Sequence, residues 1–158
     1  LVKKIGISVY SPKELELLVS KFDFDLVQLP FSVVDKRFLD TGWLSKLYNQ
    51  NKEIHARSVF LQGLLLMLPE NRPKKFDRWD DFWLFWDNWL DKNNLSALQA
   101  TIRYALSFKE IKKVIVGVNS TIQLTEIIDA SSGPKPFLPK ELNINDTDLL
   151  IPINWNKL

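Results

Sequence analysis

The chain contains no cysteine among its 158 residues, and His55 is its only histidine. Without thiols there is neither a disulfide framework nor a thiolate metal site, and one imidazole does not make a metal constellation. We therefore expect no bound metal. The lack of cysteine fits the reducing cytoplasm, where we expect the protein to be located. His55 falls within an expected strand, and a structural role is favoured for it over a functional one.

Long hydrophobic runs and an excess of one charge are also absent. The apolar cluster Leu64–Leu68 is far shorter than the roughly 18 residues that span a bilayer. No signal peptide is expected, because Leu1–Lys4 leads directly into a strand pattern. The net charge is only +2, and the basic residues are scattered rather than arranged in a stripe. We therefore expect neither a membrane nor a nucleic acid as partner.

Short apolar strands alternate with helical patterns along the chain. Strands are expected at residues 2–8, 25–29, 53–59 and 114–118, and helices at 11–21, 41–49, 76–90, 95–107 and 122–129. Ser11, Asn94, and Ser120 or Thr121 are the candidate N-caps. This alternation predicts an α/β protein with about four parallel strand–helix units. A small open α/β sheet remains an alternative fold.

Residues 1–130 hold these units, and residues 131–158 form a proline-rich tail of the same domain. We expect the tail to be mostly loop, with one short turn near Pro139–Leu142. The most aromatic stretch, from Phe76 to Leu90, includes Trp79, Trp83, Trp86 and Trp89. Aspartates interleave these rings, so packing in the core is favoured over stacking on bases or sugars.

Four segments in register carry a resemblance to a known family. Lys4–Ser8 resembles the fifth barrel strand of aldo/keto reductases, and Asp25–Phe31 with Asp35–Arg37 resembles the sixth strand and its loop. His55–Leu65 is similar to the seventh strand and the cofactor loop, and Val114–Ser120 to the eighth strand. The resemblance implies the C-terminal half of a TIM (β/α)8 barrel, which in whole takes roughly 250 residues.

The resemblance also implies a reaction, hydride transfer between NADP or NAD and a carbonyl. The family's catalytic Asp, Tyr, Lys and His lie on strands two to four, so no catalytic residue is expected in this chain and we expect it to be inactive alone. Related chains occur near surface-polysaccharide pathways, which suggests a sugar substrate in polysaccharide biosynthesis. The expected partner is an N-terminal half-barrel or a second copy of the chain.

The cofactor-binding residues implied by the resemblance follow the strands. They are Ser8, Gln28, Arg57, Ser58, Phe60, Gln62, Gly117, Asn119, Ser120 and Gln123. Ser8 and Gln28 match positions that bind the nicotinamide carboxamide, although Ser8 at a strand end also suits a loop contact. Arg57 stands where many members stack an aromatic ring on nicotinamide, and a salt bridge across the strand ends is the alternative.

The remaining cofactor positions concern phosphates. Ser58, Phe60 and Gln62 match the pyrophosphate loop, and Gly117 to Gln123 match the segment that holds the adenosine phosphate. A helix start at Ser120 suits an anion, although plain capping explains the same residues. Gln123 stands where NADPH-preferring members often have arginine, and Val9 and Ile127 replace polar contacts, so we expect weak or altered cofactor binding.

Three functions remain open at this point. The first is a fragment or split part of an NAD(P)H-dependent carbonyl oxidoreductase. The second is a non-catalytic half-barrel interaction module that pairs with another chain or with itself. The third is a small α/β binding protein that is unrelated to the family.

Overall fold

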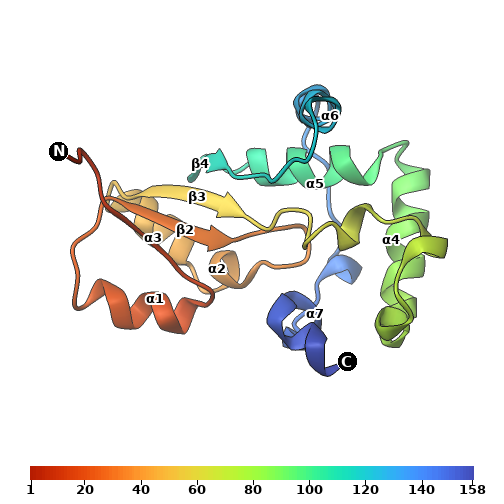
Figure 1. The fold of residues 1–158 in the computed structure, drawn as a ribbon, viewed down its shortest axis with the longest axis horizontal. Helices are drawn as coiled ribbons and strands as arrows, with labels where there is room; N and C mark the ends of the chain where they lie inside the picture. Colours follow the sequence, from red (N-terminus) through yellow and green to blue (C-terminus); the bar gives the residue numbers. More distant parts are fainter.

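The computed structural model describes residues 1–158 and is built on one four-stranded sheet (Figure 1). The strands are β1 (Gly6–Ser8), β2 (Leu26–Pro30), β3 (Glu53–Arg57) and β4 (Ile111–Val114). They pair in sequential order, and every pair is parallel. The predicted order of four parallel strand–helix units is therefore confirmed.

Helices connect and flank the strands. The α-helices are α1 (Pro12–Val19), α2 (Arg37–Asp40), α3 (Trp43–Asn49), α4 (Asp80–Lys92), α5 (Ala97–Leu106), α6 (Thr121–Ser131) and α7 (Thr147–Leu150). Short 3-10 turns span Leu64–Leu66, Pro69–Asn71, Lys74–Trp79, Lys140–Leu142 and Pro152–Lys157. The short helix α2 had no counterpart in the sequence pattern. None of the helices combines the length and apolar character that a bilayer span requires.

The helix starts follow local capping chemistry. Ser11 Oγ accepts a hydrogen bond from the Glu14 N–H at 3.2 Å, as its place before Pro12 predicts. The prediction of Asn94 as the cap of α5 was wrong, because Ser96 and Gln99 form a reciprocal capping box. Asn94 instead adopts a left-handed backbone with a φ of 51°, in the turn after α4.

Strand β4 lies earlier than the predicted range 114–118. Its last ladder pair joins Val114 to Ala56, and only the Ile115 N–H still donates to Ala56 O, at 2.7 Å. Strand β3 ends at Arg57, so the apolar residues after Ile115 have no neighbouring strand to pair with. The first strand is likewise shorter than predicted, because its partner β2 begins only at Leu26.

The tryptophans of α4 lie in the core, as the sequence predicted. Trp86 is fully buried and its Nε1 donates to Leu65 O at 3.3 Å. Trp83 is also buried, and its Nε1 donates to Phe76 O at 3.1 Å. Residue Phe76 belongs to a 3-10 turn, so the predicted helix starts later than expected, at Asp80.

The C-terminal segment is more ordered than the predicted loop. The short turn at Lys140–Leu142 is confirmed, but α7 and the last 3-10 turn were not predicted. Leu149 and Leu150 are buried, and Asp146 pairs with Arg78 at 3.1 Å. Figure 1 shows α7 beyond the carboxyl ends of the strands, so this segment covers the end of the sheet where a site is expected.

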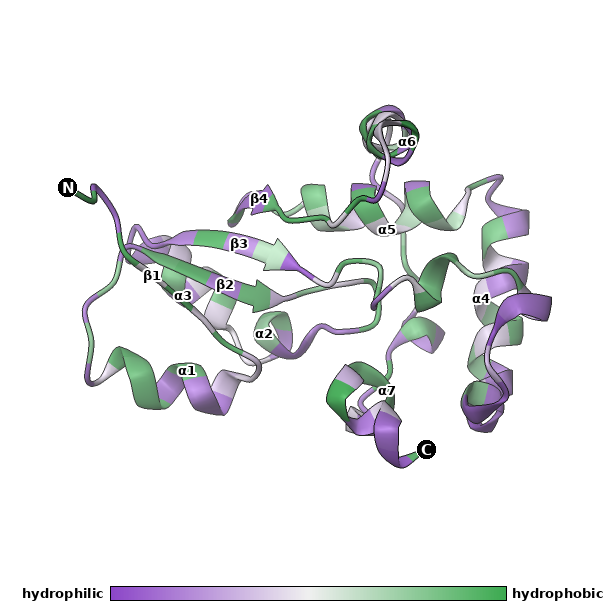
Figure 2. Ribbon diagram, viewed as in Figure 1, coloured by the Kyte–Doolittle hydropathy of each residue, from purple (hydrophilic) through white to green (hydrophobic).

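Helix α6 is the least buried of the longer helices. Ile122 is 69% exposed and Ile128 is 58% exposed, whereas Ala130 is buried. Figure 2 shows apolar and polar residues mixed along this helix. Its main attachment is to α5, where Arg103 Nε donates to Ala130 O at 2.8 Å.

Candidate functional site

A cleft of about 670 Å³ opens between the loop that follows β3 and the start of α6. Its walls include most of the residues that the sequence suggested for a cofactor: Arg57, Ser58, Phe60, Gln62, Gly117, Asn119 and Gln123. Ser8, Gln28 and Ser120 do not line it. The structure thus brings together the two segments that were expected to bind phosphate, although they are far apart in the sequence.

The loop after β3 has an unusual backbone. Ser58, Leu61, Gln62 and Gly63 have φ values of 59°, 47°, 55° and 86°, in the left-handed region that side chains other than glycine rarely adopt. Such conformations persist only where the surrounding structure enforces them, and they gather at functional sites. Here Leu61 is buried, with only 1% exposure, and this packing holds the loop in place.

This loop also leaves hydrogen-bond donors unused. The backbone N–H groups of Val59, Phe60 and Gln62 donate to no other group of the protein. All three residues line the cleft. Unused N–H groups in a loop with left-handed residues form the kind of concavity that binds anions.

The opposite wall is the amino end of α6, which is capped by its own side chains. Ser120 Oγ accepts from the Gln123 N–H at 3.2 Å, and Gln123 Oε1 accepts from the Asn119 N–H at 2.8 Å. The plain capping considered from the sequence is therefore present. Next to this cap, Gly117 exposes its backbone to the cleft, with no atom within 4 Å of where a Cβ would lie.

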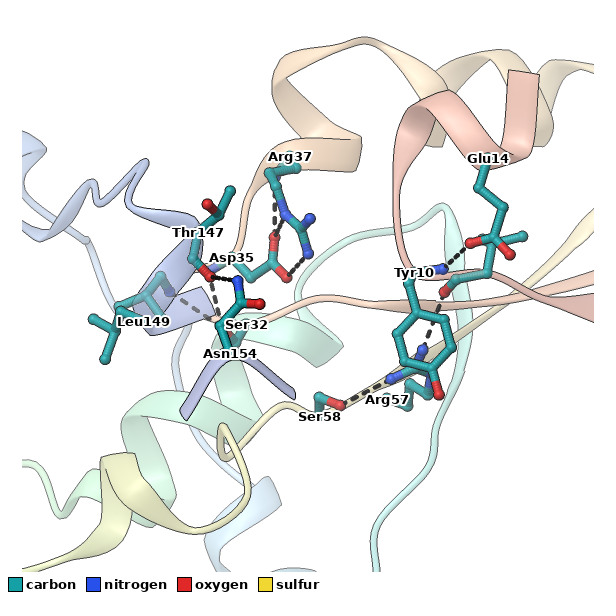
Figure 3. Close-up of polar contacts among 12 residues, drawn as sticks. Tyr10, Glu14, Ser32, Asp35, Arg37, Arg57, Ser58, Thr147, Leu149 and Asn154 are labelled. Atoms are coloured by element: carbon teal, nitrogen blue, oxygen red, sulfur yellow. Dashed lines mark hydrogen bonds and ion pairs between the residues drawn. The ribbon is translucent and has the colours of Figure 1, made fainter. Parts of the chain in front are cut away.

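Arg57 lies at the mouth of the cleft, between the ring of Tyr10 and the hydroxyl of Ser58 (Figure 3). Its Nη1 donates to Ser58 Oγ at 3.2 Å and its Nη2 to Val9 O at 3.1 Å. Its guanidinium lies over the Tyr10 ring at 4.4 Å from the centroid. The salt bridge considered for Arg57 does not form, because Asp35, the aspartate in its neighbourhood, is already bound by Arg37.

Ser8 and Gln28 lie apart from the cleft and contact each other. They are register partners in the β1–β2 pair, and Ser8 Oγ donates to Gln28 Oε1 at 3.2 Å. Strand β2 continues two residues beyond Gln28, to Pro30, and the N–H of the next residue, Phe31, donates to Arg57 O. Both polar side chains nevertheless share one face of the sheet.

His55 takes part in a charge cluster near the amino end of β3. Its Nε2 lies 2.7 Å from Glu53 Oε1, while Lys4 Nζ lies 2.7 Å from Glu53 Oε2. The hydrogen bonds from Lys4 and His55 lower the pKa of Glu53 to about 2. Since the cleft lies at the other end of β3, these contacts agree with a structural role for His55.

A second pocket, of about 460 Å³, was not foreseen from the sequence. Residues 150–153 of the C-terminal segment line it together with Tyr10, Asp35, Arg37 and Arg57. Asp35 and Arg37 form a two-point ion pair, with Nε to Oδ1 at 2.8 Å and Nη2 to Oδ2 at 2.7 Å. The spacing of these two residues was visible in the sequence, but the aperiodic C-terminal segment gave no sign that it closes a pocket.

Comparisons with known proteins agree with this architecture. A family model described as "Aldo/keto reductase family" matches residues 1–143. The holo form of aldo-keto reductase AKR11C1 from Bacillus halodurans superposes with a TM-score of 0.63 at 17% identity, over 84% of this chain and 45% of that one. Its apo form gives 0.63 at 18%, over 87% and 47%. A search of curated proteins gave no match.

The glycerol dehydrogenase AKR11B4 from Gluconobacter oxydans is also similar, with a TM-score of 0.51 at 15% identity, over 87% of this chain and 53% of that chain. The chain therefore spans about half the length of these solved structures, and its fold is part of a TIM barrel. The match overturns the alternative of an unrelated α/β binding protein. Because the family model covers nearly the whole sequence, the chain belongs to the aldo/keto reductase family.

Proposed function

We propose that this chain is the cofactor-binding part of an NAD(P)H-dependent carbonyl oxidoreductase. The dinucleotide phosphates lie in the cleft between the loop after β3 and α6. The observation that carries the proposal is the set of unused N–H groups of Val59, Phe60 and Gln62 on the cleft wall. N–H groups of this kind bind phosphate oxygens without any charged side chain.

The charges of the cleft bear on the choice of nucleotide. Gln123 carries no charge, and Glu126, which also lines the cleft, brings a carboxyl group rather than a cation. The 2′-phosphate of NADPH carries extra negative charge and gains from a neighbouring arginine. Since the α6 wall offers no such cation, the proposal is that NADH binds at least as tightly as NADPH.

Hydride transfer also needs a proton donor at the developing alkoxide. Tyr10 is the tyrosine nearest the site, but the side chain that lies against its ring is Arg57 rather than a lysine. We therefore assign the proton donor to the other half of the barrel and expect this chain alone to turn over no carbonyl. The proposed carbonyl substrate is a sugar.

A partner for the sheet belongs to the same proposal. Strands β1 and β4 each pair with one neighbour only, and Ile5, Ile115 and Val118 are 59%, 40% and 39% exposed beside these edges. Open strand edges with apolar neighbours favour pairing with another strand. We assign this role to an N-terminal half-barrel. The second candidate function, a non-catalytic interaction module, rests on the same exposed residues.

The test is a fluorescence titration of the chain with NADH and NADPH, beside an NADPH oxidation assay with a panel of aldehydes. Saturable nucleotide binding without turnover is the expected result. Gly117→Leu adds a side chain at the cleft, where the site of its Cβ is open, and should abolish binding. Lys112→Leu, on an exposed residue outside the cleft, is the control. Equal binding by both variants would contradict the proposal.

A further inference from the structure

The guanidinium of Arg57 has no counter-ion. Of its five N–H donors, two go to neutral oxygens, those of Ser58 and Val9. No carboxylate lies within ion-pair distance of Arg57, whereas the nearby Arg37 is bound at two points by Asp35. Arg57 is partly buried. A buried charge is costly unless it is paired, so this side chain is a ready partner for an anion.

Arg57 belongs to two cavities at once. Together with Ser58 and Gln62 it lines both the cleft proposed for the nucleotide and the second pocket of about 460 Å³. Figure 3 shows it beside Tyr10, which also lines the second pocket. A ligand in the second pocket would thus contact the same arginine as a nucleotide in the cleft.

The walls of the second pocket indicate what such a ligand carries. Apolar residues supply much of the lining, among them Leu61, Leu150 and Pro152. The Asp35–Arg37 pair is neutral as a whole, which leaves the single positive charge of Arg57. One cation against an apolar wall is matched by a monoanion, and the planar fork of arginine suits a carboxylate.

We infer that this pocket binds a carboxylate-bearing ligand through Arg57, with the body of the ligand against the apolar wall. The identification of this ligand as the carbonyl substrate rests on the proposed function, because it assumes a dinucleotide in the neighbouring cleft. The substrate is then an oxo acid or a sugar acid. Tyr10 is a positioning residue, since the guanidinium of Arg57 lies over its ring, 4.4 Å from the ring centroid.

The test uses benzoate and benzamide, which have nearly the same shape and differ in charge. Calorimetry on the full 158-residue chain measures both affinities, and the arginine Nε–H resonances report which side chain responds. Charge-assisted hydrogen bonds should make benzoate bind about tenfold more tightly or better. Arg57→Gln should remove this difference, Arg57→Lys should restore part of it, and Lys112→Gln, with the same loss of charge, should leave it intact.

Equal affinities for benzoate and benzamide in the unmodified chain overturn the inference, as does the absence of benzoate binding. Tighter binding of inorganic phosphate than of benzoate, if it too is lost in Arg57→Gln, overturns the assignment to a carboxylate. A parallel NADH titration separates the two proposals. NADH binding without benzoate binding leaves the cofactor proposal standing and removes the acid pocket. Arg57-dependent benzoate binding without NADH binding supports the pocket and removes its assignment to a reductase substrate.

Discussion

Ser8 and Gln28 face each other across the β1–β2 pair, with Ser8 Oγ donating to Gln28 Oε1 over 3.2 Å. An amide and a hydroxyl in this position are suited to a carboxamide, which needs both a donor and an acceptor. Gln28→Leu should therefore lower the affinity for NADH about fivefold, the worth of one hydrogen bond of ~1 kcal/mol. Fluorescence titration measures this, and an unchanged dissociation constant would remove Gln28 from the site.

Arg57 should also discriminate between the two redox forms of the nucleotide. The oxidised nicotinamide ring is cationic, and a guanidinium without a counter-ion repels it, whereas the reduced ring is neutral. Arg57→Tyr should raise the affinity for NAD⁺ relative to that for NADH. The measurement is the ratio of the two dissociation constants in each variant. If this ratio is the same in Arg57→Tyr as in the parent, the nicotinamide ring does not lie next to Arg57.

Gly63 is expected to be required for its backbone conformation alone. Its φ is 86°, and nothing lies within 4 Å of an added Cβ, so Gly63→Ala introduces strain without a clash. The expected loss in the free energy of unfolding is about 1–2 kcal/mol. Gly117→Ala is the matched control, because its surroundings are equally open and its φ is not positive. Equal stability of the two variants in urea unfolding would contradict this account.

Trp86 should be the most sensitive residue of α4. It is fully buried and stacks on Trp89 at 5.6 Å between ring centroids. Trp86→Ala should cost about 3–5 kcal/mol through lost burial and the cavity left behind. Leu84→Ala, at a position of the same helix that is 65% exposed, should change little. Thermal unfolding followed by circular dichroism compares the two.

Glu53 should make the stability of the chain depend on acid pH. Its pKa is lowered from 4.5 to about 2 in the folded protein, chiefly by hydrogen bonds from Lys4 and His55. A lowered carboxyl pKa stabilises the fold above pH 4.5, and this stabilisation is lost as the pH falls towards 2. Glu53→Gln should therefore be less stable than the parent at neutral pH and converge with it in acid. If the free energy of unfolding of the variant and of the parent changed with pH in the same way, the charge cluster around Glu53 would contribute nothing to stability.

The alternation of apolar strands and helices was enough to predict the parallel sheet and its order. It misplaced β4, because residues 114–118 look like a buried strand, while the length of the partner β3 decides where pairing stops. Strand length depends on a neighbour that is distant in the sequence, so periodicity alone does not fix it. The prediction of a loop for the C-terminal segment was wrong for a related reason. Leu149 and Leu150 are buried, but no helical or strand period in the sequence around them indicates it.

The candidate site shows a similar division. The neighbourhood of the loop after β3 and the start of α6 could be predicted from the sequence, because resemblance in register fixes which strand ends these two segments follow. Asp35 pairs with Arg37, two residues further along the loop after β2, and this leaves Arg57 without a partner. The sequence alone does not show which of the two arginines Asp35 binds. The hydrogen bond from the Asn119 N–H to Gln123 Oε1 was likewise not predicted, although a glutamine three residues after a serine cap is a local signal for a contact of this kind.

The two walls of the cleft are anchored with unequal strength. Leu61 fixes the loop after β3 in the core, whereas Ala130 is the only buried residue of α6. Segments with few buried apolar contacts open locally at a lower free energy than the rest of a fold. Helix α6 should therefore exchange its amide hydrogens early in the free chain and be protected once the cleft is filled. A bound dinucleotide would act as part of the architecture, supplying to α6 the packing that the polypeptide does not provide.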